Sequence, residues 1–172
     1  MQAIETVTVG SGGAASITFS SIPDTYTDLM IVVSSRSTVS GVNDALDLLP
    51  NGASGNNSLR YLRGDGSSVQ SGSETTNLVS YTPGATTTSD TFGNASIYIT
   101  NYTSTSSKSI STDGVGENNA TSVRSAIIAT LHSGTTAFTS LELSLRNGNF
   151  VEHSTATLYG ILAGSDGSTT VT

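Results

Sequence analysis

The stretch that decides the fold is "LMIVVSS", residues 29–35. Its β-branched residues favour extended backbone, and no polar residue interrupts the run before its end. Pro23 lies upstream in "SIPDTYTD" and cannot donate a ladder hydrogen bond, so we expect a loop before the strand. Residues 29–35 are therefore predicted to form a central β-strand that is buried on both faces.

Short apolar alternations bounded by turn residues recur along the whole chain. At the start, residues 4–9 and 15–19 flank "GSGG" (10–13), whose glycines accept the positive φ of a tight reversal, so we expect a hairpin there. This spacing predicts about nine to eleven strands in all. The remaining expected strands are 45–50, 58–63, 95–100, 108–113, 140–146 and 154–162.

Two segments leave the choice between helix and strand open. Apolar residues recur every four positions in "SVRSAIIATLH" (122–132), which suits a helix face, but the paired isoleucines and neighbouring strands favour a strand. The segment "VNDALDLL" (42–49) has room for a helical turn capped by Asn43 or Asp44. It is too short to set the fold class.

Many short strands with polar turns and no βαβ rhythm predict an all-β fold. We expect one domain over residues 1–172, a single antiparallel β-sandwich of jelly-roll type with long polar loops. The weakly patterned stretches 66–91 and 101–121 are predicted to be extended loops or arms. Residues 163–172 are expected to be a C-terminal tail that is flexible or ordered by a partner.

The composition excludes several classes of protein. Serine and threonine make up 57 of 172 residues, and the net charge is -7 with 13 acidic and 6 basic residues. So few basic residues argue against nucleic-acid binding and against binding an anionic membrane surface. There is no cysteine, hence no disulfide or thiolate metal site, and the N-terminus has no signal-peptide pattern. We expect a soluble protein that is made in a cytoplasm.

The residues that carry catalysis in other proteins are sparse here. His132 ends an apolar segment and His153 lies in "FVEHST", and neither has an acid and a nucleophile at motif spacing. No Gly-x-Ser-x-Gly elbow and no twelve-residue calcium loop is present. We therefore predict no enzymatic activity, no metal and no cofactor.

Candidate contacts with a glycan or a partner are Tyr81, Tyr102 and Arg63. The two tyrosines lie at expected loop positions, where an exposed ring suits sugar binding. Arg63 opens the tripeptide Arg63-Gly64-Asp65, which serves as an adhesion signal in some extracellular proteins. A turn explains it more simply: Gly64 and Gly66 supply unusual φ angles and Asp65 caps the reversal. We expect any partner of Arg63 to be a carboxylate on a neighbouring subunit.

The string of segments resembles small virion structural proteins of tailed bacteriophages. The segments that carry the resemblance span residues 4 to 162 and are "ITFSSIPDTYTDLMIVVSSRS", "NNSLRYLRGDG", "TFGNASIYITNYTSTSSKSISTDGVGENNATS" and "IIATLHSGTTAFTSLELSLRNGNFVEHSTATLYGI".

The resemblance implies a structural protein of the virion, assembled in the host cytoplasm. The first expectation is a capsid decoration (cement) protein, with the major capsid protein and sister subunits as partners, in a homotrimer. The alternative is a tail-fibre or receptor-binding component that recognises a host-surface glycan. The resemblance does not distinguish a position on the head from one on the tail.

Overall fold

The structure is a computed structural model that describes residues 1–116 and 124–162. Twelve β-strands build this part of the protein. Within these two ranges no helix is long and apolar enough to span a membrane. In chain order the strands are β1 (Gln2–Thr8), β2 (Ser16–Phe19), β3 (Asp28–Ser35), β4 (Asn43–Pro50), β5 (Asn57–Gly64), β6 (Val69–Glu74), β7 (Leu78–Pro83), β8 (Gly93–Ile99), β9 (Lys108–Val115), β10 (Ser125–His132), β11 (Leu141–Leu145) and β12 (Thr155–Ile161).

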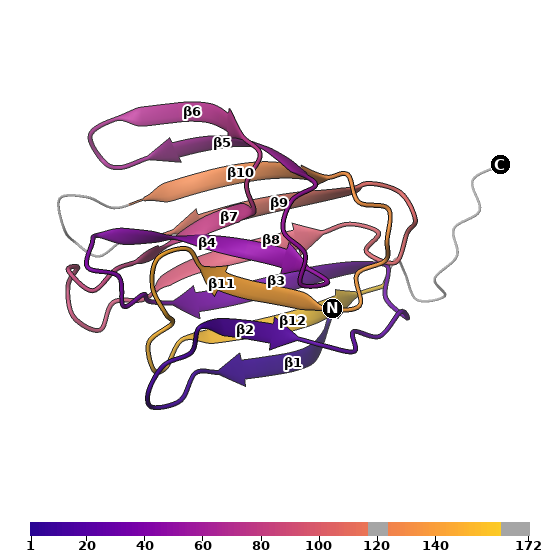
Figure 1. The fold of residues 1–172 in the computed structure, drawn as a ribbon, viewed down its shortest axis with the longest axis horizontal. Coiled ribbons are helices and arrows are strands. Elements are labelled where there is room, and N and C mark those ends of the chain that lie inside the picture. The colour runs from indigo at the N-terminus through magenta and orange to yellow at the C-terminus, as the bar shows by residue number, and fades with distance from the viewer. Residues whose placement is uncertain (117–123, 163–172) are drawn as a thin grey trace.

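The strands form two antiparallel sheets that face each other, so the fold is the predicted β-sandwich (Figure 1). The large sheet has eight strands in the order β1-β12-β3-β8-β9-β10-β5-β6, and the small sheet has four in the order β2-β11-β4-β7. Because four strands cannot cover eight, β7 lies over β8, β9 and β10, and the hairpin of β5 and β6 projects beyond it (Figure 1). We call this projecting hairpin the overhang.

The core lies between the sheets because each strand directs alternate side chains toward it. Burial alternates strictly along β4 and β10. Ile17 and Phe19 of the small sheet share one apolar cluster with Ile31 and Leu158 of the large sheet, and none of the four is more than 1 % exposed. Burial of such side chains, at about 25 cal/mol per Å² of apolar surface, is the main force that holds the two sheets together.

Strand β3 has the predicted interior position, between β12 and β8, but the prediction of burial on both faces is wrong. Leu29, Ile31 and Val33 face the small sheet and are buried, whereas Val32 on the other face is 39 % exposed. The outer face of the large sheet has no covering layer in the described part of the chain. A β-branched run alone does not reveal how many faces are covered.

The hairpin predicted at the start of the chain is also wrong, although both of its strands exist. β1 pairs with β12 at the edge of the large sheet, and β2 pairs with β11 in the small sheet. The glycine-rich segment crosses between the sheets, with Gly12 and Gly13 at positive φ. Ala14 then forms a bridge with Phe150.

Three further predictions concern local structure. Residues 125–132 form strand β10, so strand was the correct choice for 122–132 in its described part. The helical turn allowed over 42–49 is wrong, because Asn43–Pro50 is strand β4. The segment 66–91 is not one long loop, since it contains β6 and β7, which raise the strand count to twelve.

Of the stretch 101–121, residues 101–107 form a loop before β9, and residues 117–121 lie outside the described residues. The predicted tail, residues 163–172, lies outside them as well.

The polar loop after β7 is fastened by the buried side chain of Arg36. Its guanidinium donates hydrogen bonds of 2.8 to 3.4 Å to four residues of this loop, which are Ala85, Thr87, Thr88 and Thr91. Most of these acceptors are backbone carbonyls, so the loop conformation is set by one arginine rather than by an apolar core of its own.

Candidate binding surface

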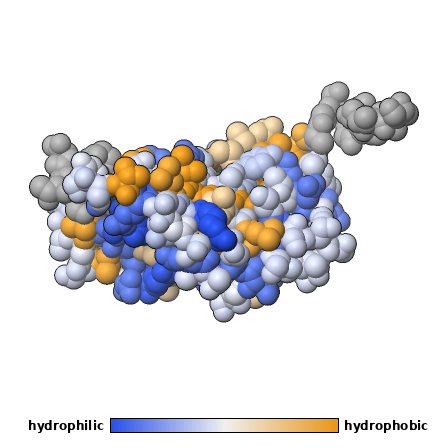
Figure 2. All heavy atoms as spheres, turned by 90° about the horizontal axis from the view of Figure 1, so that it is seen from above, coloured by the Kyte–Doolittle hydropathy of each residue, from blue (hydrophilic) through white to orange (hydrophobic). Residues whose placement is uncertain are grey.

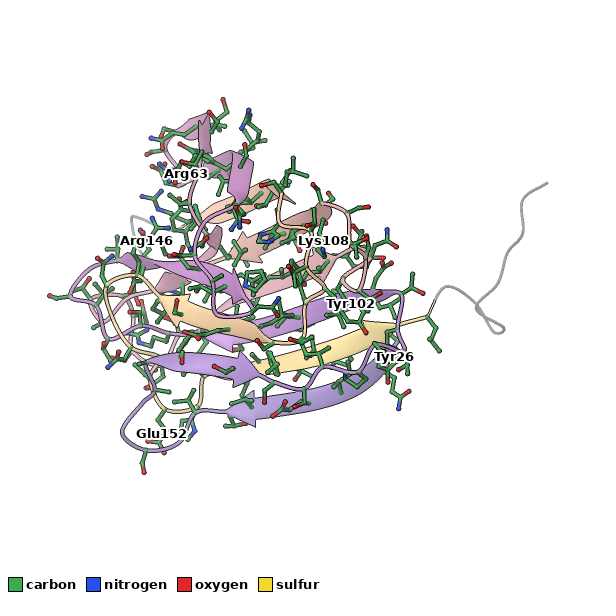
Figure 3. All side chains as sticks on the ribbon, turned by 45° about the vertical axis from the view of Figure 1, so that its right-hand side comes forward. Tyr26, Arg63, Tyr102, Lys108, Arg146 and Glu152 are labelled. Atoms are coloured by element: carbon green, nitrogen blue, oxygen red, sulfur yellow. The ribbon has the colours of Figure 1, made fainter. Side chains whose placement is uncertain are left out.

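The candidate surface lies where the overhang meets the edge strand β7. Of the three residues predicted from the sequence, Arg63 on β5 and Tyr81 on β7 come together there, while Tyr102 lies elsewhere. Figure 3 shows Arg63 on the overhang with Arg146 below it, and Tyr102 on the other side of the molecule. The pair therefore links the two sheets at the open end of the sandwich.

Arg63 is held in one orientation by aromatic rings and hydrogen bonds. Its guanidinium carbon is 4.8 Å from the ring centre of Tyr61 and 5.6 Å from that of Tyr81. Nε and Nη2 donate to the side-chain oxygen of Gln70 at 2.9 and 2.7 Å, and Nη1 donates to the Tyr81 hydroxyl. A guanidinium stacked and bonded in this way is preorganised, because little side-chain entropy remains to be lost on binding.

Tyr61 occupies its place because residue 72 on the neighbouring strand β6 is glycine. Tyr61 and Gly72 are direct cross-strand neighbours, and a β-carbon on Gly72 would lie 2.5 Å from the Tyr61 hydroxyl oxygen. The ring therefore lies across the glycine, which leaves Arg63 stacked against it.

Two further arginines complete the cluster around Tyr81. The guanidinium carbon of Arg124, just before β10, is 4.8 Å from the Tyr81 ring centre. Arg146, just after β11, pairs with Asp47 through Nη2 and Oδ1 at 2.6 Å, and this hydrogen bond raises the pKa of Arg146. Residues Tyr61, Arg63, Gln70, Tyr81, Arg124 and Arg146 are called the arginine cluster below.

Among the residues that the structure describes, two arginines of the cluster have no anionic partner. In the described part of the chain the one ion pair is Arg146 with Asp47, so neither Arg63 nor Arg124 is paired with a carboxylate. The Nε of Arg124 is buried and has no hydrogen-bond acceptor among the described residues. A buried donor without an acceptor costs about 1–3 kcal/mol. The cluster therefore has unused capacity to bind an acidic group.

Asp65 lies at the same small recess as Arg63 and Arg124 but is engaged elsewhere. Its carboxylate accepts hydrogen bonds from the backbone N–H groups of Ser67 and Ser68 at 2.9 and 2.7 Å and from both hydroxyls. These bonds, led by the backbone N–H of Ser67, hold the pKa of Asp65 well below its usual range.

The tripeptide Arg63-Gly64-Asp65 lies at the end of β5 and the start of the turn to β6, as expected. One detail of that expectation is wrong. Gly66 has a φ of +85°, but Gly64 is not in the positive-φ region, and a β-carbon on it would be 3.8 Å from the nearest atom outside its chain neighbours. Only Gly66 supplies an unusual backbone angle to the turn.

Tyr102 was predicted as a surface contact on the basis of its polar neighbours, but it belongs to the core. Its side chain is 0 % exposed, and its hydroxyl donates to the carbonyl oxygen of Pro23. Burial raises its pKa. A ligand cannot reach this ring without opening the sandwich.

The two histidines differ in burial. His132 ends β10 and is buried, with Nδ1 2.8 Å from the Asn57 side-chain oxygen, while His153 is exposed. Within residues 1–116 and 124–162 no group of three or more histidine, aspartate and glutamate side chains is placed to hold a metal ion.

Comparison with known proteins adds no assignment. No protein family, curated protein or solved structure matches this chain. The resemblance to phage virion proteins therefore rests on the quoted segments alone.

Sequence reasoning missed most of the arginine cluster. Tyr61 and Arg63 are two residues apart on a predicted strand, so their shared face was visible in the sequence. Arg124, Arg146 and Gln70 come from other segments, and no local pattern connects them to Tyr81.

Proposed function

We propose that this chain is a non-enzymatic structural component of a tailed-bacteriophage particle, and that it is a capsid decoration (cement) protein. Its partners are the major capsid protein and sister subunits, in a homotrimer on the head shell. It is assembled in the host cytoplasm and resides in the virion.

The observation that carries the proposal is the strand order. Along the chain, β1, β3, β8 and β12 fall in the large sheet and β2, β4, β7 and β11 in the small sheet, in the orders β1-β12-β3-β8 and β2-β11-β4-β7. This interleaving supports a jelly roll, which is built from eight strands in two Greek keys and is common in viral capsid domains. The other four strands, β5, β6, β9 and β10, extend the large sheet on one side.

The extension supports a role in assembly because it exposes apolar surface. Leu62, Val69 and Ile127 are 51 %, 76 % and 63 % exposed, and Leu62 and Ile127 are direct neighbours on β5 and β10. Figure 2, which looks down on the overhang side, shows hydrophobic atoms among the hydrophilic surface. Grouped exposed aliphatic side chains are typical of interaction surfaces.

Electron microscopy of phage particles that lack this protein tests the proposal. We expect intact tails on heads that have lost surface density and that break more readily on heating. Addition of the purified protein should restore both properties. Unaltered heads on particles that no longer adsorb to the host contradict the proposal.

A tail-fibre or receptor-binding role is the second candidate, because jelly rolls also occur in lectins and the arginine cluster contains two half-buried tyrosine rings, Tyr61 and Tyr81. A glycan-binding screen with Tyr81→Ala tests it, and Tyr159→Ala on β12 is the matched control. Saturable binding that Tyr81→Ala abolishes and Tyr159→Ala retains supports this role. The absence of saturable binding counts against it.

A further inference from the structure

We propose that copies of this chain associate head to tail through unlike sheet edges, so that β6 of one copy lies beside β1 of the next. The start of β6, near Arg63 and Arg124, then faces the end of β1, near Glu152. The inference deepens the proposed function, since it names the surfaces through which sister subunits meet. It depends on charge, strand direction and the unpaired arginines.

The accessible charges of the two sheet edges are complementary. Of the six basic residues, Arg36 and Lys108 are buried. Of the other four, Arg60 and Arg63 lie on β5 and Arg124 lies just before β10, whereas Arg146 follows β11 in the small sheet and is paired with Asp47. The same edge carries two carboxylates, Glu74 at the far end of β6 and Asp65, which is bonded within its own turn. At the opposite edge, Glu5 on β1 and Glu152 before β12 are exposed, and neither β1 nor β12 contains a basic residue. Association of unlike edges brings opposite charges together, and association of like edges does not.

Strand direction also fits a head-to-tail contact. Every neighbouring pair in the eight-stranded sheet is antiparallel, so the edge strands β1 and β6 run in opposite directions. A second copy placed beside β6 in the same orientation therefore offers its β1 antiparallel to β6. No strand of the described residues occupies either outer edge. The contact continues the alternation without turning one copy over.

Antiparallel pairing of β6 with β1 brings Arg63 and Arg124 of one copy close to Glu152 of the next. Antiparallel pairing sets the start of β6 against the end of β1. At the start of β6, Gln70 holds Arg63 across the strand pair. At the end of β1, the N–H of His153 bonds to the carbonyl oxygen of Val9 at 2.9 Å, which fixes Glu152 there. Figure 3 shows Arg63 and Glu152 at opposite edges but toward the same end of the strands.

Each edge has features that suit the contact. β6 is exposed along most of its length and contains neither lysine nor proline, the residues that commonly block edge pairing. β1 has a bulge between Ala3 and Glu5, at the end away from the proposed contact. The carboxylate of Glu152 supplies the anionic partner that Arg63 and Arg124 lack among the described residues, and the neighbouring Val69 is covered at the same time.

Sedimentation velocity of the purified full chain across the micromolar range tests the inference. We expect association that weakens at high salt, because exposed charges drive it. Arg124→Glu and Glu152→Arg should each weaken association at least about tenfold. An equimolar mixture of the two variants should associate again, because each chain then meets an opposite charge at both edges. Glu142→Arg on β11, an interior strand of the small sheet, is the matched control and should associate normally.

Folding of each variant is checked by circular dichroism, and Arg124→Gln, which removes the charge without reversing it, should give an intermediate loss. A chain that stays monomeric at low salt overturns the inference. So does association that survives both reversals, or a mixture that fails to restore it. A monomeric chain that binds an acidic sugar through Arg124 assigns the cluster to a ligand and also overturns it.

Different measurements test the inference and the proposed function, so one can be contradicted while the other holds. Cosedimentation with particles that lack the protein reports the function, and self-association in solution reports the inference. A monomer that still decorates particles contradicts only the inference. A self-associating chain that ignores particles contradicts only the proposed function.

Discussion

The ammonium nitrogen of Lys108 lies 5.0 Å from the ring centre of Phe138, inside the sandwich. The same nitrogen donates to the carbonyl oxygens of Ser104 and Ser106 at 2.8 and 2.9 Å and approaches that of Gly134 at 3.5 Å. Burial lowers the pKa of Lys108. The charge is tolerated because carbonyl dipoles and a ring face replace its water.

Replacement of Lys108 with methionine should lower the free energy of unfolding by about 1–3 kcal/mol. Methionine fills a similar volume but leaves the carbonyls of Ser104 and Ser106 without a donor. Urea denaturation followed by circular dichroism measures the change. Arg60→Met, which removes an exposed cation, should change stability by less than about 0.5 kcal/mol. Equal losses in the two variants contradict this account of Lys108.

His132 should make the fold sensitive to mild acid. Its ring meets Phe138 edge-on with centres 5.1 Å apart, and burial, followed by the charge of Lys108, lowers its pKa. The unfolded chain therefore binds this proton more readily than the folded one. Stability is complete above the unfolded value of about 6.5 and falls as the pH drops from there toward the folded pKa.

Thermal unfolding at about pH 7.5 and pH 5 measures the effect. The decrease in Tm should be smaller in His132→Asn than in the natural chain, because the titrating group is gone. The control is His153→Asn, since His153 is exposed and asparagine tolerates its φ of +70°. A decrease that is the same in all three proteins assigns the acid sensitivity to other groups.

The sequence predicted strands well where one face is buried and poorly where neither is. "LELSL" of β11 alternates leucine with polar residues, and its three leucines are the buried positions, so its period was visible. "VQSGSE" of β6 has no apolar alternation, because the overhang leaves both of its faces largely exposed. Strand partners were beyond the sequence as well, since β1 pairs with β12, more than 140 residues away.

Only those parts of the candidate surface that come from residues close together in the sequence were predictable. Arg63 and Tyr81 are both half-buried, and Tyr81 lies on strand β7 rather than in the expected loop. The contact between them depends on the pairing of β7 with β4, which places β7 at the edge of the small sheet. Tyr102 has the polar neighbours of an exposed loop residue, but it belongs to the main apolar cluster together with Phe138, and its hydroxyl bonds to Pro23, both of which come from other segments. Tertiary contacts of this kind leave no local pattern.

Gly66 should be the sensitive glycine of the Arg63-Gly64-Asp65 turn. Its φ of +85° disfavours any side chain, so Gly66→Ala should lower the free energy of unfolding by about 1 kcal/mol. Gly64→Ala is the matched control, because Gly64 is extended and has space for a β-carbon, and it should be neutral or slightly stabilising. Chemical denaturation of both variants measures the difference. A larger loss for Gly64→Ala contradicts this assignment of the turn.

Arg63 should stabilise the overhang more than the rest of the fold. Arg63→Ala removes the bonds to Gln70 and Tyr81 and the stacking against Tyr61, which together should cost about 1–2 kcal/mol because the group is only half-buried. The loss should be local, since β6 has no partner except β5 among the described strands.

Amide hydrogen exchange distinguishes local from global loss. Amides of β6 should exchange faster in Arg63→Ala, while those of β3 in the sheet interior should keep their protection. Tyr81→Phe, which removes only the hydroxyl, should give a smaller acceleration in the same strand, and Arg60→Ala should give none. Equal acceleration in β3 and β6 means that Arg63 supports the whole sandwich, and unchanged exchange in β6 means that the contacts between Arg63 and its tyrosines contribute nothing measurable to the overhang.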